Sequence, residues 1–399
     1  MSIGLSYILI TPYTIVKSRT GGVISRLLSR LDLELIGAQI ITPSAELANE
    51  FAESMLLAKN NTEWPNSSKI LHDYILRTFS PSGGRRHRVL MLLFKGEDAI
   101  QKLTYIAGSL YPKAVNFDLI RGETIRDTYA DLILKDDDPG EVLYFEPAVF
   151  TPHSEETALH NLELFGKFAA NEPNIVENVK YENPSSIERT LVIIKPDNWR
   201  FPSSKPGTIM DMFSKTGLRI VGCKIYQMSV SEALEFYGGV RKALNEKLSP
   251  IAGKMAADIL GEKYDMEISS DTLKGLTESF GMAYADDQFS KIIEFMSGVR
   301  PEQADPNDFD KPGKVKCMVL IYEGENAVEK IRKVLGPTDP TKAPGGTVRR
   351  EFGSDIMINT AHASDSAQSA VREMAIVNIR KNNLSEIIFE YLKEIKMKN

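Results

Sequence analysis

His362 is the residue whose surroundings predict chemistry most clearly. It is one of five histidines, follows the strand-like run IMIN, and precedes a polar ASDS segment, after which a helix is expected. Asp365, with Gln368 three residues later, resembles a capping box, so the N-terminus of that helix should lie near His362. A helix N-terminus favours anions, and Glu373, two turns into the helix, could reach an imidazole nitrogen. These features predict a nucleophile with an orienting partner beside an anion site.

Several cationic residues could complete such a site. Lys195 ends a strand-like run, Arg332 lies on a helix before LGPTDP, and Arg349 follows a glycine-rich turn. Thr338, in a turn flanked by prolines, could donate its hydroxyl. Each residue alone fits an ordinary solvated surface, but together they favour a phosphate site, because phosphoryl transfer depends on positioning and on converging positive charge.

Length and composition set the broad class. A chain of 399 residues predicts two domains of ordinary size. Hydrophobic residues make up 42% and charged residues 26%, which is typical of a globular protein, and the net charge of -6 argues against a general nucleic-acid binder. No run approaches the roughly 20 apolar residues of a membrane span, and the N-terminus lacks the features of a signal peptide. We therefore expect a cytoplasmic protein.

The chain contains an internal repeat. MLLFKGEDAIQKL at 91–103 parallels VLIYEGENAVEKI at 319–331, and TIR at 124–126 parallels TVR at 347–349 in the same order. This predicts a tandem duplication with a first half at 1–170, a polar linker at 171–187 and a second half at 188–399.

Each half alternates short apolar β-branched runs with helix-period runs. The order predicts an α/β (α+β) fold of two tandem ferredoxin-like domains, each a four-stranded antiparallel sheet covered by helices. Long stretches at 52–88, 238–287 and 299–314 are expected to be irregular, and the last two to be insertions in the second half. The segment SSDTLKGLTESFGMAYADD could hold a helix or two, and its shape stays open.

The second half resembles the nucleoside diphosphate kinases. The resemblance includes ERTLVIIKPD at 188–197 and runs without a gap from Arg332 through Glu373. Within it, NTAHASDS at 359–366 is similar to the active-site motif of the family, with Ala363 where a glycine is usual. The resemblance implies a phosphotransferase that moves the γ-phosphate of a nucleoside triphosphate to a diphosphate by a ping-pong route through phosphorylated His362.

The resemblance also implies roles for the neighbouring residues. Glu373 would orient the imidazole, Asn359 would bond a ribose hydroxyl, and Tyr237 matches a tyrosine near the catalytic histidine and lysine. The phosphates would be bound by Lys195, Arg332, Thr338 and Arg349. Mg²⁺ would be held mainly by the phosphates of the nucleotide, and the partners would be nucleoside di- and triphosphates.

The base end of the implied site departs from the family. A phenylalanine that stacks on the base usually follows the tyrosine closely, but here about fifty residues separate Tyr237 from the next matching run, FSKIIEFMSG. Phe289 is the best candidate for the stacking ring, with Tyr284 as the alternative. Base preference or affinity is therefore expected to differ from that of the family.

The first half looks like a degenerate copy. Phe150 stands at the position of the nucleophile, and among the phosphate binders only Arg126 is retained, opposite Arg349. The other replacements are Thr11 for Lys195, Thr104 for Arg332, Leu110 for Thr338 and Asn161 for Glu373. His153, three residues beyond Phe150, is a possible substitute nucleophile, but it lacks the surrounding cations.

The association of the two halves and the alternative to catalysis are also expectations from the sequence. Because members of the family pair through equivalent surfaces, the two halves are expected to form an intramolecular pseudo-dimer, and a homo-oligomer is possible. The alternative to an active kinase is a catalytically weak nucleotide-binding scaffold or regulatory protein of the same fold.

Overall fold

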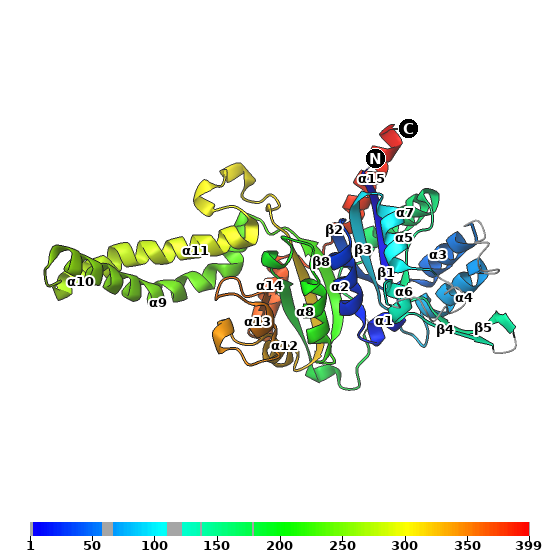
Figure 1. Ribbon diagram of the computed structural model, residues 1–399, viewed down its shortest axis with the longest axis horizontal. Coiled ribbons are helices and arrows are strands. Elements are labelled where there is room, and N and C mark those ends of the chain that lie inside the picture. The colour runs from blue at the N-terminus through cyan, green and yellow to red at the C-terminus, as the bar shows by residue number, and fades with distance from the viewer. Residues whose placement is uncertain (1–2, 58–66, 110–121, 136–137, 178, 399) are drawn as a thin grey trace. The chain divides into compact units, whose positions relative to one another are not determined.

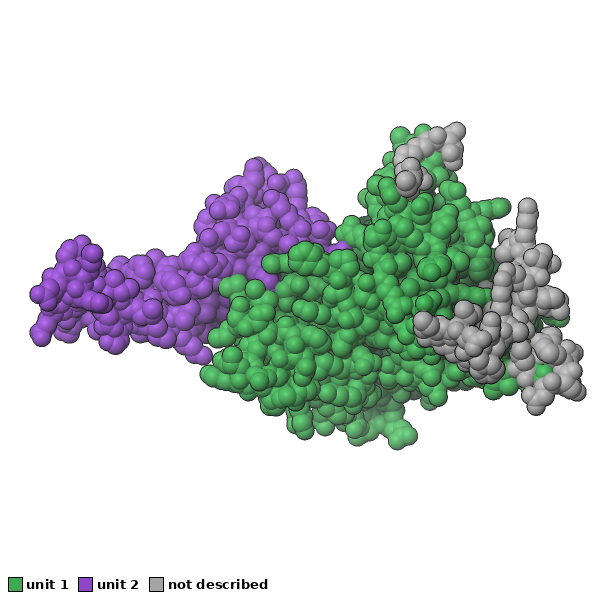
Figure 2. Space-filling model, in the orientation of Figure 1, with its two compact units in different colours: residues 1–225, 318–371, 378–399 green, residues 226–317, 372–377 purple. Residues whose placement is uncertain are grey.

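The computed structural model describes residues 3–57, 67–109, 122–135, 138–177 and 179–398 (Figure 1). The chain divides into two compact units (Figure 2). Unit 1 comprises Met1–Ile225, Met318–Val371 and Asn378–Asn399, and unit 2 comprises Tyr226–Cys317 and Arg372–Val377. No helix among the described residues combines the length and the hydropathy that crossing a membrane requires.

The first half contains a four-stranded sheet in the order β2-β3-β1-β6. Its strands are β1 (Ile3–Ile10), β2 (Glu34–Ile41), β3 (Val89–Glu97) and β6 (Val149–Phe150). β1 pairs antiparallel with β3 and β6, and β2 pairs antiparallel with β3. The apolar runs that define these strands are buried almost throughout, because helices cover the sheet.

The second half repeats this sheet in the order β8-β9-β7-β10. The strands are β7 (Ile187–Ile194), β8 (Arg219–Tyr226), β9 (Cys317–Glu325) and β10 (Ala361–Ala363). The register is also repeated, since Leu9 faces Phe150 in the first sheet and Ile193 faces His362 in the second. The predicted fold of two four-stranded antiparallel sheets with helices is confirmed.

Helices in the first half surround its sheet and include a stretch that was expected to be irregular. Residues 52–88 hold the end of α3 (Ala45–Leu57) and all of α4 (Ser67–Phe79), which pack against each other. The expectation of an irregular stretch is wrong for 52–57 and 67–79, which are helical and bury side chains such as Met55 and Tyr74 in the core of the first half. Residues 80–88 contain no helix. The other elements are α1 (Pro12–Val16), α2 (Thr20–Arg30), α5 (Ala99–Ala107), α6 (Ile125–Tyr129), α7 (Glu155–Asn171) and the hairpin of β4 (Asp131–Lys135) and β5 (Asp138–Glu146).

The last helix of the chain completes the core of the first half. α15 (Leu384–Lys398) packs against α7 and β2 (Figure 1). Leu384, Ile388 and Leu392 are buried in the same cluster as the side chains of the first sheet. The predicted division at 1–170, 171–187 and 188–399 stays a prediction, and this helix is a segment of the second half that stabilises the first.

Two glycines allow the helices α2 and α8 (Lys205–Ser214) to pack closely. A Cβ atom on Gly21 would lie 2.5 Å from the carbonyl oxygen of Gly207, and one on Gly207 would lie 2.4 Å from that of Gly21. Ser25 in α2 donates a 3.0 Å hydrogen bond to the carbonyl oxygen of Ser204. This contact joins the first half to the second within unit 1.

Unit 2 is mainly a helical hairpin. α9 (Val230–Tyr264) and α11 (Met282–Ser297) run side by side, joined by α10 (Ser270–Leu276) and a π-helix at Thr277–Gly281 (Figure 1). The expectation that 238–287 is irregular is therefore wrong. Residues 299–314 form a loop with short 3₁₀ helices at Pro301–Gln303 and Pro306–Asp308.

The helix α9 forms despite residues that normally interrupt helices. Pro250 lies inside α9, and so do Gly238 and Gly239, about three turns before the proline. A capping box at Ser229 starts the helix, and packing on its neighbours compensates for the weak local propensity. A Cβ atom on Gly253 would lie 2.4 Å from the hydroxyl oxygen of Thr277, so this glycine permits close packing.

Candidate active site

His362 lies in the middle of β10, at the edge of the second sheet, and is partly exposed. The chain then turns into α14 (Ala367–Ile376), where Ser366 accepts a 3.0 Å hydrogen bond from the backbone N–H of Ser369. The capping acceptor is thus Ser366, one residue beyond the predicted Asp365. The prediction that a helix begins after the ASDS segment at 363–366 is otherwise confirmed.

The backbone before His362 is strained. Thr360 has a φ of 75°, a conformation that β-branched residues rarely adopt. Its carbonyl oxygen accepts hydrogen bonds from the backbone N–H of Lys195 at 2.9 Å and from the amide of Asn198 at 2.8 Å. These bonds hold the start of β10 against the end of β7. The sequence carried no signal for this strain, since Thr is an ordinary residue before a strand.

Lys195 is buried at the end of β7 and bonded to a second predicted residue. Its Nζ donates to the Oδ1 atom of Asn359 at 2.6 Å and to the carbonyl oxygen of Met357 at 3.3 Å. Asn359 in turn donates to the carbonyl oxygen of Thr338 at 3.2 Å. Burial, followed by the positive charge of Arg349, lowers the pKa of Lys195 to about 8. Lys195, Asn359 and Thr338 therefore form one network.

Arg349 connects this network to the strand of His362. It lies in α13 (Val348–Phe352) and donates to the carbonyl oxygen of Gly336 at 2.9 Å and to that of Ala361 at 3.1 Å. Ala361 directly precedes His362, so the guanidinium group is fixed beside the histidine backbone. Gly336 follows α12 (Ala327–Leu335), so Arg349 also links the end of that helix to β10.

Arg332 lies in the last turn of α12 and faces the start of α14. It lines an open depression together with Asp365 and Ser366. A hydrogen bond from Ser369 and the positive charge of Arg332 contribute to holding the pKa of Asp365 below its usual value. Arg332 is therefore close to the segment that follows His362, as a phosphate-binding residue would need to be.

Glu373 and Tyr237 belong to unit 2, where Arg372 contacts Glu373 and the residue that precedes Tyr237. Arg372 donates to the carbonyl oxygen of Phe236 at 3.4 Å and forms a 3.6 Å ion pair with Glu373. The side chains of Glu373 and Tyr237 are both buried. Their predicted roles toward His362 stay predictions.

The two candidates for stacking on the base differ in exposure. Phe289 is only 5% exposed, and the guanidinium carbon of Arg241 lies 5.8 Å from its ring centroid. Asp286 holds this arginine by a 2.9 Å hydrogen bond. Tyr284, the alternative, is 42% exposed. A base could therefore reach the ring of Tyr284 more readily than that of Phe289, and the stacking role stays a prediction.

The corresponding end of the first sheet is filled by aromatic side chains. Phe150, at the position of His362, is buried with its ring centroid 5.8 Å from those of Phe51 and Tyr74 and 5.7 Å from that of Phe79. Tyr74 donates its hydroxyl to the buried carboxylate of Glu146. Large rings and an acidic group thus occupy the place where the second half gathers cations.

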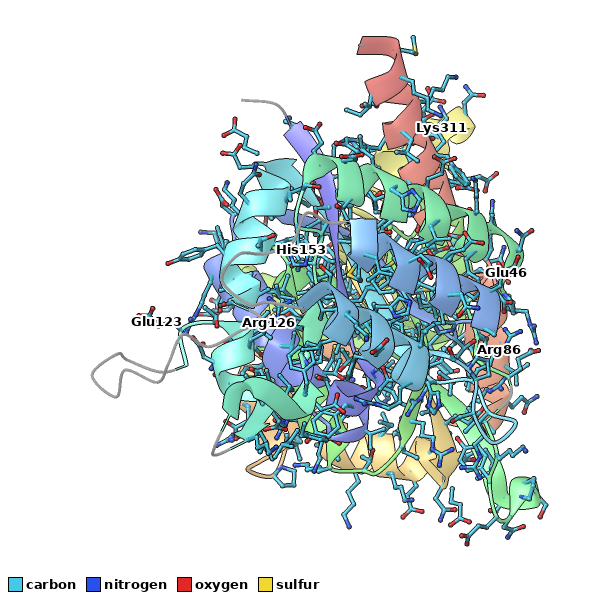
Figure 3. The ribbon with its side chains drawn as sticks, turned by 90° about the vertical axis from the view of Figure 1, so that its right-hand side faces the viewer. Glu46, Arg86, Glu123, Arg126, His153 and Lys311 are labelled. Atoms are coloured by element: carbon cyan, nitrogen blue, oxygen red, sulfur yellow. The ribbon has the colours of Figure 1, made fainter. Side chains whose placement is uncertain are left out.

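Arg126 is the retained cation of the first half, but its guanidinium is taken up by the backbone. It donates to the carbonyl oxygens of Gly108 and of Val149, the latter at 2.9 Å. Arg126 and His153 are both labelled in Figure 3. His153 is exposed, and partial desolvation by neighbouring atoms, followed by the charge of Arg126, lowers the pKa of its imidazole below the usual value. Leu110, the predicted counterpart of Thr338, lies outside the described residues.

The remaining replacements in the first half make local contacts. Thr11 donates its hydroxyl to Thr14, Thr104 donates to the carbonyl oxygen of Pro152 at 3.0 Å, and Asn161 donates to the hydroxyl of Tyr7 at 2.9 Å. In the part of the chain that the structure describes, no group of three or more His, Cys, Asp or Glu side chains is arranged to hold a metal ion.

The match of this chain to a protein-family model lies in its second half. A family model described as nucleoside diphosphate kinase matches residues 188–247 and 308–382. The chain is 33% identical over 190 residues to a nucleoside diphosphate kinase of Anaeromyxobacter sp. (strain K), which covers 48% of this chain and 88% of the relative. It is 30% identical over 191 residues to that of Bdellovibrio bacteriovorus, covering 48% and 92%.

Solved structures with similarity to the chain include two kinases of the same description. They are the nucleoside diphosphate kinase of Aquifex aeolicus, with 25% identity and a TM-score of 0.30, and the NDP kinase of Pyrobaculum aerophilum, with 25% identity and a TM-score of 0.32. Each covers 48% of this chain and 94% of the relative. Residues 248–307, which include Phe289 and Tyr284, lie outside the match to the family model. On the extent of its match to the curated relatives, the chain belongs to the nucleoside diphosphate kinase family.

Proposed function

We propose that this chain is an active nucleoside diphosphate kinase that transfers the γ-phosphate of a nucleoside triphosphate to a nucleoside diphosphate through phosphorylated His362. Family membership supports the reaction class. The observation that carries the proposal is the convergence beside His362 of a buried lysine network and a fixed arginine. Lys195 is bonded to Asn359, and Arg349 is bonded to the residue that precedes His362. A protein that kept only the fold would have no need of the buried lysine, and the first half, which keeps the equivalent arginine, has Thr11 in its place.

In the proposed first step, a nitrogen lone pair of the His362 imidazole attacks the γ-phosphorus of the triphosphate. A nitrogen–phosphorus bond forms, the bond from phosphorus to the β-bridging oxygen breaks, and the diphosphate leaves with the electron pair. In the second step, a terminal oxygen of the incoming diphosphate attacks the same phosphorus and releases the imidazole. Glu373 would accept the hydrogen bond of the other ring nitrogen and so fix the orientation of His362.

The cations would stabilise the charge on the transferring phosphoryl group. Lys195 and Arg332 have the side chains suited to phosphate oxygens, and Thr338 and Asn359 would place the sugar and phosphates. Arg349 already donates to two carbonyl oxygens, so its contribution would come mainly from its fixed positive charge and from bracing β10. Tyr237 matches the tyrosine that lies near the catalytic histidine and lysine in the family, so we assign it a position near His362 and Lys195.

Magnesium is implied by the family. The groups around His362 are mainly cationic, and no carboxylate cluster suited to a metal ion occurs among the described residues. The donor set therefore fits an ion that arrives with the nucleotide and is held by its phosphate oxygens, and no residue of this chain is assigned as its ligand. When bound, the ion neutralises part of the phosphate charge.

For the first half we infer a structural role without catalysis. The ring of Phe150 fills the nucleophile position, and the carboxylate of Glu146 would repel phosphates there. The close packing of α2 on α8 through Gly21 and Gly207 supports an intramolecular pseudo-dimer of the two halves. A cytoplasmic location and a homo-oligomer remain predictions of this proposal.

A nucleotide-binding scaffold is the rival function. One observation favours it: Phe289 is buried, with Arg241 over its ring. The nucleotide base would then stack on a different residue or bind more weakly. A scaffold would bind nucleotide and show little or no phosphoryl exchange.

Steady-state exchange kinetics separate the two functions. The kinase predicts parallel double-reciprocal plots for triphosphate and diphosphate, because the phosphoenzyme is an obligatory intermediate. His362→Ala should lower kcat by at least about a thousandfold, which corresponds to roughly 4 kcal/mol of barrier. His153→Ala, in the first half, is the matched control and should leave exchange unchanged. Nucleotide binding by calorimetry without exchange in the wild type would establish the scaffold instead.

A further inference from the structure

Helix α9 exposes an apolar stripe to solvent. Ile251, Met255 and Ile259 recur every four residues, so they lie on one face of the helix, and they are 57%, 59% and 63% exposed. The neighbouring face is already used, since Ala252, Gly253 and Ala257 are buried. We call these three residues the α9 stripe. Large apolar side chains in a contiguous exposed row on one helix are typical of an interaction surface.

Four charged side chains accompany the stripe on the same arc of the helix. Lys247 and Lys254 lie toward its N-terminal end, and Asp258 and Glu262 lie toward its C-terminal end, all of them exposed. Lys254 and Asp258 form a 3.3 Å ion pair within the helix. The surface therefore has a basic end and an acidic end, with an apolar centre.

The pattern is symmetric about Met255. Ile251 and Ile259 are equally distant from it along the chain, and the midpoints of the pairs Lys254–Asp258 and Lys247–Glu262 fall within one residue of it. A twofold axis through Met255 would place each member of a pair opposite its counterpart in an antiparallel second copy. Residues on the same side of an antiparallel helix pair face each other, so lysines would meet carboxylates and isoleucines would meet isoleucines.

We propose that the α9 stripe is a self-association surface, on which α9 of a second copy of this chain packs antiparallel about Met255. An unrelated partner would not require charges arranged symmetrically about one residue, whereas an isologous contact does. The α9 stripe lies within residues 248–307, outside the match to the family model, and Lys247 is the last residue of the first matched segment. The interaction therefore goes beyond the proposed kinase reaction and does not depend on it.

The expected dimer is weak. Residues 247–262 span about 24 Å of helix, and two helices of that length bury an area at the low end of specific interfaces. The dimer should therefore form and dissociate as the protein concentration is changed.

Sedimentation velocity of the full chain over about a hundredfold range of concentration tests the surface. The wild type should pass from monomer to dimer, and Met255→Lys should stay monomeric by placing two like charges on the axis. Tyr105→Ser removes an exposed ring from α5 in unit 1 and should dimerise like the wild type. A wild type that stays monomeric throughout, or a dimer that Met255→Lys does not weaken, would overturn the proposal.

A charge exchange tests the twofold geometry. Lys254→Glu alone and Asp258→Lys alone each create two like-charge pairs across the axis and should weaken the dimer by about tenfold. Mixing the two variants should restore association, because each copy then supplies the charge that the other lacks. Each variant also loses the ion pair within its own helix, and mixing cannot repair that loss. A mixture that associates no more tightly than either variant alone would contradict the antiparallel arrangement.

Discussion

Arg126 and Arg349 make the same two hydrogen bonds in the two halves of the chain. Arg349 donates to the carbonyl oxygens of Gly336 and Ala361, and Arg126 donates to the equivalent carbonyls in the first half. The first half keeps this arginine although it has lost the other cations. Because the arginine is kept where the other site residues are lost, we infer that it stabilises the end of the sheet in both halves. Arg349 could bind phosphate in addition.

Arg126→Ala and Arg349→Ala should therefore both destabilise the protein. Each removes the donor from two carbonyl oxygens that are partly or fully buried, which costs roughly 2 to 4 kcal/mol of unfolding free energy. Only Arg349→Ala should also lower kcat/KM for nucleotide exchange. Urea denaturation combined with steady-state kinetics measures both effects. Equal loss of exchange in the two variants, measured where both remain folded, would assign catalysis to the first half as well.

The burial of Lys195 predicts a pH dependence with opposite signs for activity and stability. With a pKa of about 8, this lysine loses its charge as the pH rises through that value. The kcat/KM for nucleotide, which reports the free enzyme, should then fall, because a neutral amine attracts phosphate less strongly. The unfolded chain, with the ordinary pKa of 10.5, binds more protons than the folded chain in this window, so the stability of the nucleotide-free protein should rise.

Lys195→Arg provides the control for this pH dependence. A guanidinium group stays protonated over the whole window, so the alkaline fall of kcat/KM should flatten even if the rate itself is lower. An unchanged alkaline limb in Lys195→Arg would assign the titration to another group.

The contact between the C-terminal helix and the first half predicts a long-range effect. Ile388 in α15 is fully buried in the core of the first half. Ile388→Ala should cost about 2 to 5 kcal/mol through lost burial and the cavity left behind. Met397→Ala, on the same helix but 78% exposed, is the matched control and should change little. Proteolysis with fragment identification should show that Ile388→Ala exposes sites within 1–170. Cleavage confined to 188–399 would contradict the packing.

Strain at Thr360 predicts a stabilising substitution that harms catalysis. A left-handed backbone costs a non-glycine residue about 1 to 2 kcal/mol, and the hydroxyl of Thr360 is buried without a hydrogen-bond partner among the described residues. Thr360→Gly should therefore raise the unfolding free energy by about 1 kcal/mol, after the entropy cost of glycine. Exchange should slow because the strand of His362 is held less firmly. A destabilised Thr360→Gly would show that the threonine side chain contributes more than its strain costs.

The sequence predicted the phosphate end of the site because that end depends on residue type and spacing over one continuous stretch. Lys195 follows a plain apolar run that forms β7, and Arg349 follows a glycine-rich turn, as predicted. The strand predicted at IMIN (356–359) is wrong, because those residues have no regular structure and His362 lies inside the short strand Ala361–Ala363. The bond from Lys195 to Asn359 joins residues 164 apart and has no local signal. The left-handed Thr360 is also invisible in sequence, since tertiary contacts impose it.

The base end was predicted less well for a physical reason. The stretch 238–287 contains Pro250 and paired glycines, which weaken local helix propensity, and α9 forms because packing within the hairpin outweighs that weakness. The same packing buries Phe289, which a count of residues after Tyr237 could not reveal. The role of α15 in the first half was likewise unpredictable, because amphipathic periodicity does not say which core a helix covers.

The most direct test of the proposed kinase reaction is to locate the phosphate on the protein. The full chain is incubated with γ-labelled ATP and magnesium, and the label is mapped to peptides under alkaline conditions. Transfer through His362 predicts acid-labile, base-stable phosphate on the peptide that contains this residue, present in His153→Ala and absent from His362→Ala. A wild type that never becomes labelled, or a label that persists in His362→Ala, would contradict it.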